Sequence, residues 1–468
     1  MTNNLEGLKI PSHWKILQLQ DVCHKITDGT HKTPNYRDSG VRFISIKNIR
    51  PYQPINWDRY EKFIDPKQHE ELVKRCRPEF DDILFPRIGT LGFAKRIDFK
   101  EEVSLFVGLG LLKPKKDMIL PKYLEYWMNH PYIYKLSHER ATGSGRLTLP
   151  LEQSRVFPVP LAPFMEQALI VSEIEKQFSR LDEAIAILKR VKANLKRYKA
   201  AVLKAAVEGK LTEDWRKLHP VVEPASKLLD RILTERRKKW KGRGKYQEPV
   251  ESDTDSLPIL PEGWTWAPLE AISDAIGGFA FESKKFTSTG YQVLKIANIR
   301  MGRIDLGQKP SFIQDVEDNV IAKYGLLEGD LVVTLTGTRK KQDYGYVAIV
   351  RNAKRLLLNQ RIARLRPADG VVPGYLALAM QDIGYRNRFF TYETGNVGQG
   401  NVGMGAITKV PVKLPPFLEQ QQIVAEVERR LSVIEELEAT VETNLTRADR
   451  LRQSILAKAF CGGLTTLQ

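Results

Sequence analysis

The tetrapeptide Leu414-Pro415-Pro416-Phe417 resembles the motif with which amino-methyltransferases hold the amino group that they methylate. Those enzymes have Asn or Asp where this chain has Leu414, and a leucine side chain forms no hydrogen bonds. The chain also has no GxxxxGK[ST] loop for nucleotide phosphates. Nor does a glycine fingerprint lie between a strand and a helix, as an S-adenosylmethionine or dinucleotide site requires. The carboxylates and lysines form no recognisable nuclease cluster, so we expect this chain not to be an enzyme.

Thiol and metal chemistry are not indicated either. Cys23, Cys76 and Cys461 are scattered, with no pair at metal-ligand spacing and too few thiols for a disulfide framework. The seven histidines all lie in the first half of the chain and lack the close pairing of a zinc site. We expect three reduced, structural cysteines and no bound metal.

The strongest chemical signal is charge. Lysine and arginine number 73 against 56 acidic residues, which leaves a net charge of +17 and a pI near 9.5. Such a balance favours a polyanionic partner, and nucleic acid is favoured over a membrane surface because no basic amphipathic helix is free for lipid. The amino terminus lacks the plan of a signal peptide and no run approaches eighteen apolar residues. We therefore expect a cytoplasmic protein.

A long helical segment that occurs twice must position these charges. Residues 158–212 and 411–465 share their first and last residues at a separation of 253, and no gap is needed between them. Apolar residues recur every three or four positions, from Ile170 to Val202 in the first copy. The second copy repeats this seam with one slip at Leu437. Proline at each start and glycine near each end are typical helix boundaries.

Helices of roughly forty residues bury little surface alone, so each seam needs a partner. The other copy is the obvious one, and we expect an antiparallel coiled coil. The alternative is two unrelated surface helices. An antiparallel pair of similar helices has an approximate two-fold axis, which would place the segment preceding each helix at opposite ends and inverted.

The segments that precede the helices also repeat. Phe43 to Arg50 matches Val293 to Arg300 at a separation of 250, and Pro121 matches Pro373 at 252. Each block is expected to contain short strands and then a helix, which indicates an α+β fold. The expected strands are residues 41–46, 83–88 and 105–112, and then 291–296, 331–335, 346–350 and 358–365.

Two kinds of irregular segment remain. The linker at 213–258 is expected to hold a short helix over 226–239 and a basic run, 236–245, with Trp240 inside it. Such a run suits DNA, but solvated linkers also have this composition. Glycine-rich loops at 141–146 and 394–405 would let the backbone approach a phosphate, or simply connect elements.

In its repeated plan the chain resembles the specificity subunits of type I restriction–modification enzymes. The resemblance rests on a variable block, a helix that begins Pro-Phe-Leu-Glu-Gln-Gln-Gln-Ile-Val at Pro416, and a Gly-x-Leu-Thr end, all occurring twice in nearly the same form. It implies target-recognition domains at 1–157 and 259–410, helical spacers at 158–212 and 411–468, and a basic linker at 213–258. The predicted fold class is thus two repeated α+β domains and a pseudo-two-fold antiparallel coiled coil.

The resemblance also implies a function and partners. Each target-recognition domain would read one half of a bipartite site on double-stranded DNA, and the spacer would set the gap and dock two methyltransferase subunits. Motor-nuclease subunits would join them. S-adenosylmethionine, ATP and magnesium are expected on those partners, and none on this chain.

Two modules that read different half-sites should differ at the residues that contact DNA. Arginine pairs with guanine and Asn or Gln with adenine, while lysine more often holds phosphate. One pattern recurs in both modules: Asn48 and Arg50 in the first match Asn298 and Arg300 in the second. These residues either contact DNA or shape a turn. The predicted contacts in the first module are Lys47, Asn48, Arg50, Arg87, Thr90 and Arg146. Those in the second are Lys295, Asn298, Arg300, Thr338, Arg339, Lys340, Gln342, Gln360 and Arg361.

Two other functions remain open. A stand-alone DNA methyltransferase or nuclease would need a cofactor or metal motif, and activity of the purified chain with S-adenosylmethionine would reveal it. A coiled-coil scaffold without DNA binding would be insensitive to DNA and to salt.

Overall fold

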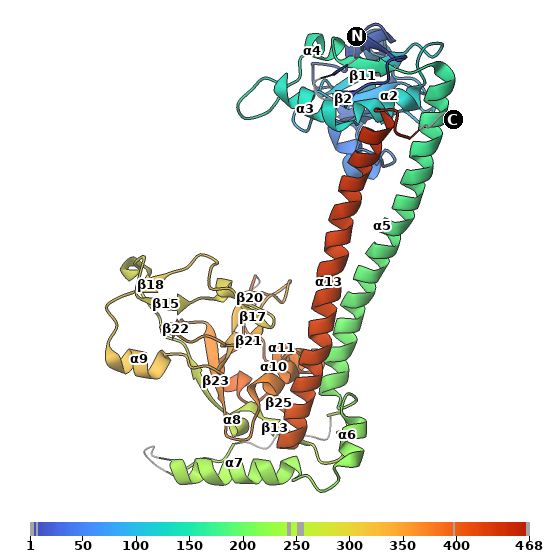
Figure 1. The fold of residues 1–468 in the computed structure, drawn as a ribbon. Coiled ribbons are helices and arrows are strands. Elements are labelled where there is room, and N and C mark those ends of the chain that lie inside the picture. The colour runs from blue at the N-terminus through green and yellow to red at the C-terminus, as the bar shows by residue number, and fades with distance from the viewer. Residues whose placement is uncertain (1–3, 6–7, 241–244, 250–256, 396–397, 465–468) are drawn as a thin grey trace. The chain divides into compact units, whose positions relative to one another are not determined.

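A computed structural model describes residues 4–5, 8–240, 245–249, 257–395 and 398–464 (Figure 1). Thr465, parts of the basic run and two residues of the second glycine-rich loop lie outside these ranges. The chain forms two compact units: residues 1–191 with 440–468, called unit 1, and residues 192–439, called unit 2. In the described residues, no helix is both long and apolar enough to cross a membrane.

Unit 1 contains two small four-stranded sheets and short helices. The larger sheet has the order β4-β11-β8-β9 and is antiparallel, and the other has the order β10-β6-β7-β5. The strands of the first sheet are Cys23–Asp28, Leu109–Pro114, Ile83–Pro86 and Lys95–Arg96, and those of the second are Val103–Leu105, Val41–Ile44, Phe63–Ile64 and Tyr36–Arg37. The helices are α1 (Pro66–Val73), α2 (Pro121–Met128), α3 (Pro131–Glu139) and α4 (Leu151–Arg155).

Unit 2 has a similar topology, with three described strands rather than four in its second sheet. Its sheets have the orders β14-β23-β19-β21 and β18-β15-β22. The strands are Ser273–Gly277, Ile362–Pro367, Leu331–Thr334 and Val347–Ile349, and then Phe312–Ile313, Tyr291–Leu294 and Leu356–Leu358. The helices before the long one are α8 (Leu269–Ile272), α9 (Asp318–Tyr324), α10 (Pro373–Gln381), α11 (Ile383–Thr391) and α12 (Met404–Ile407). The α+β class and the internal repeat are therefore confirmed.

Each module also returns to its own beginning. The strand just before the long helix, β12 (Pro158–Leu161), pairs with β3 (Lys15–Gln18) in unit 1. In unit 2, β25 (Pro411–Leu414) pairs with β13 (Thr265–Pro268) in the same antiparallel way. Both long helices thus start from the same place in the module that precedes them.

Two of the expected strands are each divided by a turn. Residues 105–112 hold the end of β10 and the start of β11, because a turn closes where the Leu109 N–H donates to the Phe106 carbonyl at 2.9 Å. Residues 358–365 are divided in the same way between β22 and β23, around Arg361 with φ of 66°. In both units the turn carries the chain from one sheet to the other, so one apolar run serves two sheets.

The described part of the linker contains two helices. The helix expected over 226–239 is confirmed as α7 (Ala225–Lys239), and a shorter helix, α6 (Glu213–Leu218), precedes it. Ala225, Leu228 and Ile232 of α7 are buried in the core of unit 2, so this part of the linker packs as a component of that unit.

The two long helices are α5 (Phe164–Val207, 44 residues) and α13 (Phe417–Ala459, 43 residues). Each is followed closely by a glycine in the left-handed conformation, Gly209 with φ of 71° and Gly462 with φ of 74°. The next residue closes the end by donating its N–H five residues back, Lys210 to the Ala205 carbonyl and Gly463 to that of Lys458, both at 2.9 Å. The glycines expected at the helix ends therefore cap them as the sequence predicts.

α5 and α13 pack against each other in antiparallel orientation. In unit 1 Asp182 forms an ion pair with Arg452, and in unit 2 Lys199 lies 3.9 Å from Glu435. Lys199 comes after Asp182 in α5, whereas Glu435 comes before Arg452 in α13 by the same number of residues. The two helices therefore run in opposite directions. Ile170, Ile174 and Val202 are buried, as expected of seam positions. Val191, Tyr198, Leu437 and Leu451, which the pattern also assigns to the seam, are exposed because two helices cover only a narrow stripe of each other.

A buried glutamine joins each module to its long helix. In unit 1 the amide oxygen of Gln167 accepts from the Leu120 N–H at 2.9 Å, and its amide nitrogen donates to the carbonyls of Met118 and Ala162. Gln420 makes the equivalent bonds in unit 2, to the Val372 N–H at 2.8 Å and to the carbonyls of Gly370 and Pro415. Neither side chain is accessible to solvent. Each thereby fixes α2 or α10 against the first turn of the helix.

Candidate nucleic-acid interface

In unit 2 several of the predicted contact residues lie on one exposed loop. Strand β20 (Thr336–Thr338) leads into it and pairs with β24 (Gln399–Asn401) from the second glycine-rich segment. Thr338, Arg339, Lys340 and Gln342 are all exposed. The Thr338 N–H donates to the Asp343 carboxylate at 2.6 Å, and Arg339 pairs with Glu393 at 2.8 Å. The loop is therefore held at its base while its polar side chains face solvent.

A pocket of about 620 Å³ lies beside this loop. Arg300 and Thr338 both line it, together with Gln399 from β24. Arg300 donates to the carbonyls of Ala297 and Ile299, both at 2.9 Å, and to the Gln308 side chain at 2.8 Å. The structure thus brings two predicted contact residues to one concave surface, with the guanidinium of Arg300 held in a fixed position.

Gln360 and Arg361 occupy the exposed turn between β22 and β23. The Arg361 carbonyl accepts from the Leu335 N–H at 2.9 Å, so this turn lies next to the strand that leads into β20. The predicted residues of unit 2 after position 330 therefore lie on neighbouring loops.

The recurring asparagines shape a turn in both modules. The Asn48 amide oxygen accepts from the Ser45 N–H, and its nitrogen donates to the carbonyls of Asn56 and Tyr60, all at 3.0 to 3.1 Å. Asn298 makes the matching bonds with Lys295, Asp305 and Gln308. Both side chains are buried. Of the two interpretations that the sequence left open for this pair, the geometry supports the turn, and we do not retain these asparagines as contact residues.

The neighbouring cations are also tied to their own turns. The Arg50 guanidinium donates to the Ile49 carbonyl at 2.8 Å, just as Arg300 does to that of Ile299. The Lys295 ammonium donates to the Ser311 hydroxyl at 2.6 Å. These side chains are half-buried, so each still has part of its surface open to a ligand.

In unit 1 the remaining predicted residues divide between two hollows. Lys47 and Arg146 line a small one of about 130 Å³, where the Lys47 ammonium lies 4.5 Å from the centre of the Tyr60 ring. Thr90 and Arg50 line another of about 630 Å³. Lys47, Thr90 and Arg146 are exposed. The Arg146 Nε atom lies 3.8 Å from the point where a Cβ atom would stand if Gly89 were another residue. Their loops are therefore close together.

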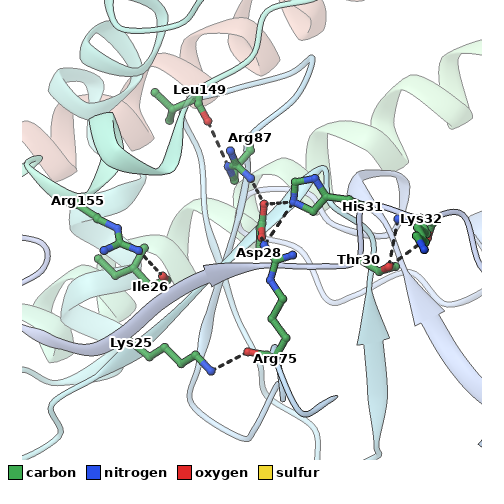
Figure 2. Close-up of polar contacts among 10 residues, drawn as sticks. All are labelled: Lys25, Ile26, Asp28, Thr30, His31, Lys32, Arg75, Arg87, Leu149 and Arg155. Carbon is green, nitrogen blue, oxygen red and sulfur yellow. Dashed lines mark hydrogen bonds and ion pairs between the residues drawn. The ribbon is translucent and has the colours of Figure 1, made fainter. Parts of the chain in front are cut away.

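Arg87 differs from the other predicted contacts because a buried carboxylate holds it. Figure 2 shows Arg87, Arg75 and His31 converging on Asp28 at the end of β4. The Arg87 side chain is only 11% exposed and also donates to the Leu149 carbonyl at 3.2 Å. Its guanidinium therefore binds groups in the interior of the module, and this placement does not suit the DNA contact that the sequence predicted.

Sequence reasoning missed residues on the same surfaces. Gln399 lies opposite Thr338 and is separated by 253 residues from Arg146, the same separation that relates the long helices. Extending that separation backwards through the glycine-rich loops would have identified it. Arg75 and His31 carried no comparable signal, because only the fold brings them to Asp28.

The described residues offer no metal site at these surfaces. No group of three or more His, Cys, Asp or Glu side chains there could hold a metal ion. Cys23, Cys76 and Cys461 are free thiols. Burial raises the pKa of the Cys23 and Cys76 thiols to about 12, so both remain protonated and unreactive at neutral pH.

Known proteins with the same organisation are specificity subunits. Residues 261–447 match the family model described as the type I restriction modification DNA specificity domain. The type I restriction enzyme EcoKI specificity subunit of Escherichia coli K12 is 26% identical over 98% of this chain and 90% of its own length. The StySPI specificity subunit of Salmonella potsdam is 23% identical with the same coverage.

The fold has a solved counterpart. A chain from a structural study of complex assembly and conformational transition in the type I restriction–modification system superposes with a TM-score of 0.65. The superposition covers 97% of this chain and 99% of that one, at 16% identity.

The matched family model and the named relatives group this chain with DNA-recognition proteins rather than with catalytic ones. Over nearly its whole length the chain resembles the type I restriction–modification specificity subunits, which are non-catalytic DNA-recognition components of their complexes.

Proposed function

We propose that this chain directs a type I restriction–modification complex to a bipartite DNA sequence, with each α+β module reading one half. The observation that carries the proposal is the duplicated glutamine anchor. Gln167 and Gln420 hold each module to the start of its own long helix through the same three bonds. Helices that run in opposite directions would present such modules to DNA as inverted half-site readers.

The proposed contacts are the exposed side chains of the loops described above. In unit 2 these are Thr338, Arg339, Lys340, Gln342, Gln360 and Arg361, with Lys295, Arg300 and Gln399 beside them; in unit 1 they are Lys47, Arg50, Thr90 and Arg146. The two sets differ in chemistry while their frameworks match. This difference is what two modules with different half-sites require.

The paired helices would set the number of unread base pairs and dock two methyltransferase subunits, and motor-nuclease subunits would complete the complex. S-adenosylmethionine, ATP and magnesium would be bound by those partners. A methyltransferase that acts on a base within a duplex must flip it out, and this chain would position it to do so. The complex would act in the cytoplasm.

Methylome sequencing tests the proposal. Cells without adenine methylation would express this chain together with the methyltransferase encoded beside it, or that methyltransferase alone. A bipartite methylated motif that requires this chain is the expected result. Unchanged methylation, or a short undivided motif, would contradict the reading of two half-sites.

A further inference from the structure

A group of charged side chains in unit 1 has no counterpart at the equivalent positions described in unit 2. We call Asp28, His31, Arg75 and Arg87 the Asp28 cluster (Figure 2). The Asp28 side chain is 2% exposed and forms ion pairs with both guanidinium groups, and its Oδ2 atom lies 3.0 Å from His31 Nε2. A buried carboxylate needs such partners.

The fold itself does not require this cluster. Asp28 is the last residue of β4 and pairs with Gly110. Its equivalent in unit 2 is Gly277, the last residue of β14, which pairs with Ala363. The N–H groups of Arg87 and Leu335 donate to equivalent carbonyls, those of Gly108 and Arg361. A glycine and a buried leucine therefore build the same framework without charge.

The charges of the cluster do not balance. Arg87 is nearly buried and is sufficient to neutralise Asp28, whereas the side chain of Arg75 is 56% exposed and that of His31 59%. His31 Nε2 lies 3.4 Å from the Arg75 guanidinium. The cluster therefore presents a net positive charge to solvent. Its buried carboxylate orients the Arg75 side chain in advance. Binding a ligand therefore costs that side chain less conformational entropy.

The cluster adjoins the loops that carry proposed contact residues. The Leu149 N–H donates to the Arg87 carbonyl at 2.7 Å, and the Gly89 N–H donates to the Leu147 carbonyl at 2.7 Å. Arg87 thereby links Asp28 to the loops of Thr90 and Arg146. The Arg75 guanidinium pairs with the same carboxylate as Arg87, so it lies close to the residue that joins these loops.

We propose that Arg75, with His31 beside it, binds a backbone phosphate of DNA next to the half-site that unit 1 reads. Arg87 is a positioning residue, which holds Asp28 and the reading loops together. The proposal rests on the proposed function, and it adds a contact that positions the duplex without reading its sequence.

The test uses the full chain assembled with its methyltransferase subunits and a duplex that carries the methylated motif. Arg75→Ala is expected to weaken binding severalfold and to lower the slope of log K against log salt by about one, equally for all bases in the half-site. Arg77→Ala is the matched control, because Arg77 is equally exposed on the same segment and lies 3.6 Å from Glu102. Arg75→Lys should keep most of the salt slope.

Methylphosphonate linkages, which remove the charge of a backbone phosphate, provide a second test that compares the wild-type chain with Arg75→Ala on modified DNA. Methylphosphonate linkages placed one at a time beside the half-site should include one that weakens wild-type binding and has no further effect on Arg75→Ala. If Arg75→Ala and Arg77→Ala behave alike, or if no linkage shows this coupling, the phosphate contact is wrong. Failure of the wild-type complex to prefer its motif would instead contradict the proposed function.

Discussion

The side-chain oxygen of Gln420, a fully buried residue, accepts a hydrogen bond from the backbone N–H of Val372 at 2.8 Å. Val372 is the N-cap residue just before α10, and Gln420 lies in the first turn of α13. One side chain thus couples the recognition module to the helix that would set its position. Gln167 and Leu120 form the same relationship in unit 1.

Replacement of Gln420 by alanine should loosen this coupling. The Val372 N–H and the carbonyls of Gly370 and Pro415 would lose their partners, at a cost of about 2 to 4 kcal/mol. Hydrogen–deuterium exchange should speed up in peptides of unit 2 and stay unchanged in those of unit 1 that are remote from α13. Gln421→Ala, an exposed neighbour, is the control. Equal exchange in both variants would show that the anchor contributes little.

The recurring asparagine should affect stability rather than base preference. Asn298→Ala removes three bonds to the backbone around a buried turn, and we expect a loss of about 2 to 4 kcal/mol in unit 2. Thermal unfolding measures this change, and the methylated motif should stay the same at a permissive temperature. A stable variant with a relaxed half-site would instead identify Asn298 as a base contact.

Gln342 is a better candidate for reading a base. Its side chain is exposed and its φ is 48°, so Gln342→Gly removes the amide without straining the backbone. We expect the preference at one or two positions of a single half-site to weaken by about 1 to 3 kcal/mol. Lys340→Ala in the same loop should weaken binding to all sequences alike. Methylome sequencing and competition binding distinguish these patterns, and uniform weakening by Gln342→Gly would make it a backbone contact.

His130 should make unit 1 sensitive to acid. Burial lowers its pKa from 6.5 to about 4, and its Nδ1 accepts from the Tyr132 N–H at 3.0 Å. Between these two values the unfolded chain binds the proton more tightly, so the free energy of unfolding should fall as the pH drops from about 6.5 to 4. The loss is at most about 3 kcal/mol.

His130→Asn keeps a good helix cap and removes the titration, so unfolding of unit 1 should depend less on pH between these values. His138→Gln is the control, because His138 lies on the same helix and is only half-buried. Denaturant unfolding across this range, followed by hydrogen exchange in unit 1, measures the effect. An unchanged pH dependence in His130→Asn would assign the acid sensitivity to other groups.

The sequence alone determined the repeated architecture, because the relevant signals are local or periodic. Apolar residues at helical spacing, prolines and glycines at helix ends and a constant separation of 253 residues identify α5 and α13 without a structure. The same separation relates Gln167 to Gln420, although a glutamine in sequence gives no sign that it is buried. The sequence alone also shows that the catalytic motifs considered above are absent from it.

Only the tertiary structure decided what the individual polar residues do. Asn48 and Arg87 have the chemistry of DNA contacts, yet the fold surrounds one with backbone carbonyls and the other with a buried aspartate. Arg75 and Gln399 reach the surfaces where contacts are proposed through residues distant in sequence. A side chain's role depends on which polar groups lie within about 3 Å of it, and long-range pairing sets that distance.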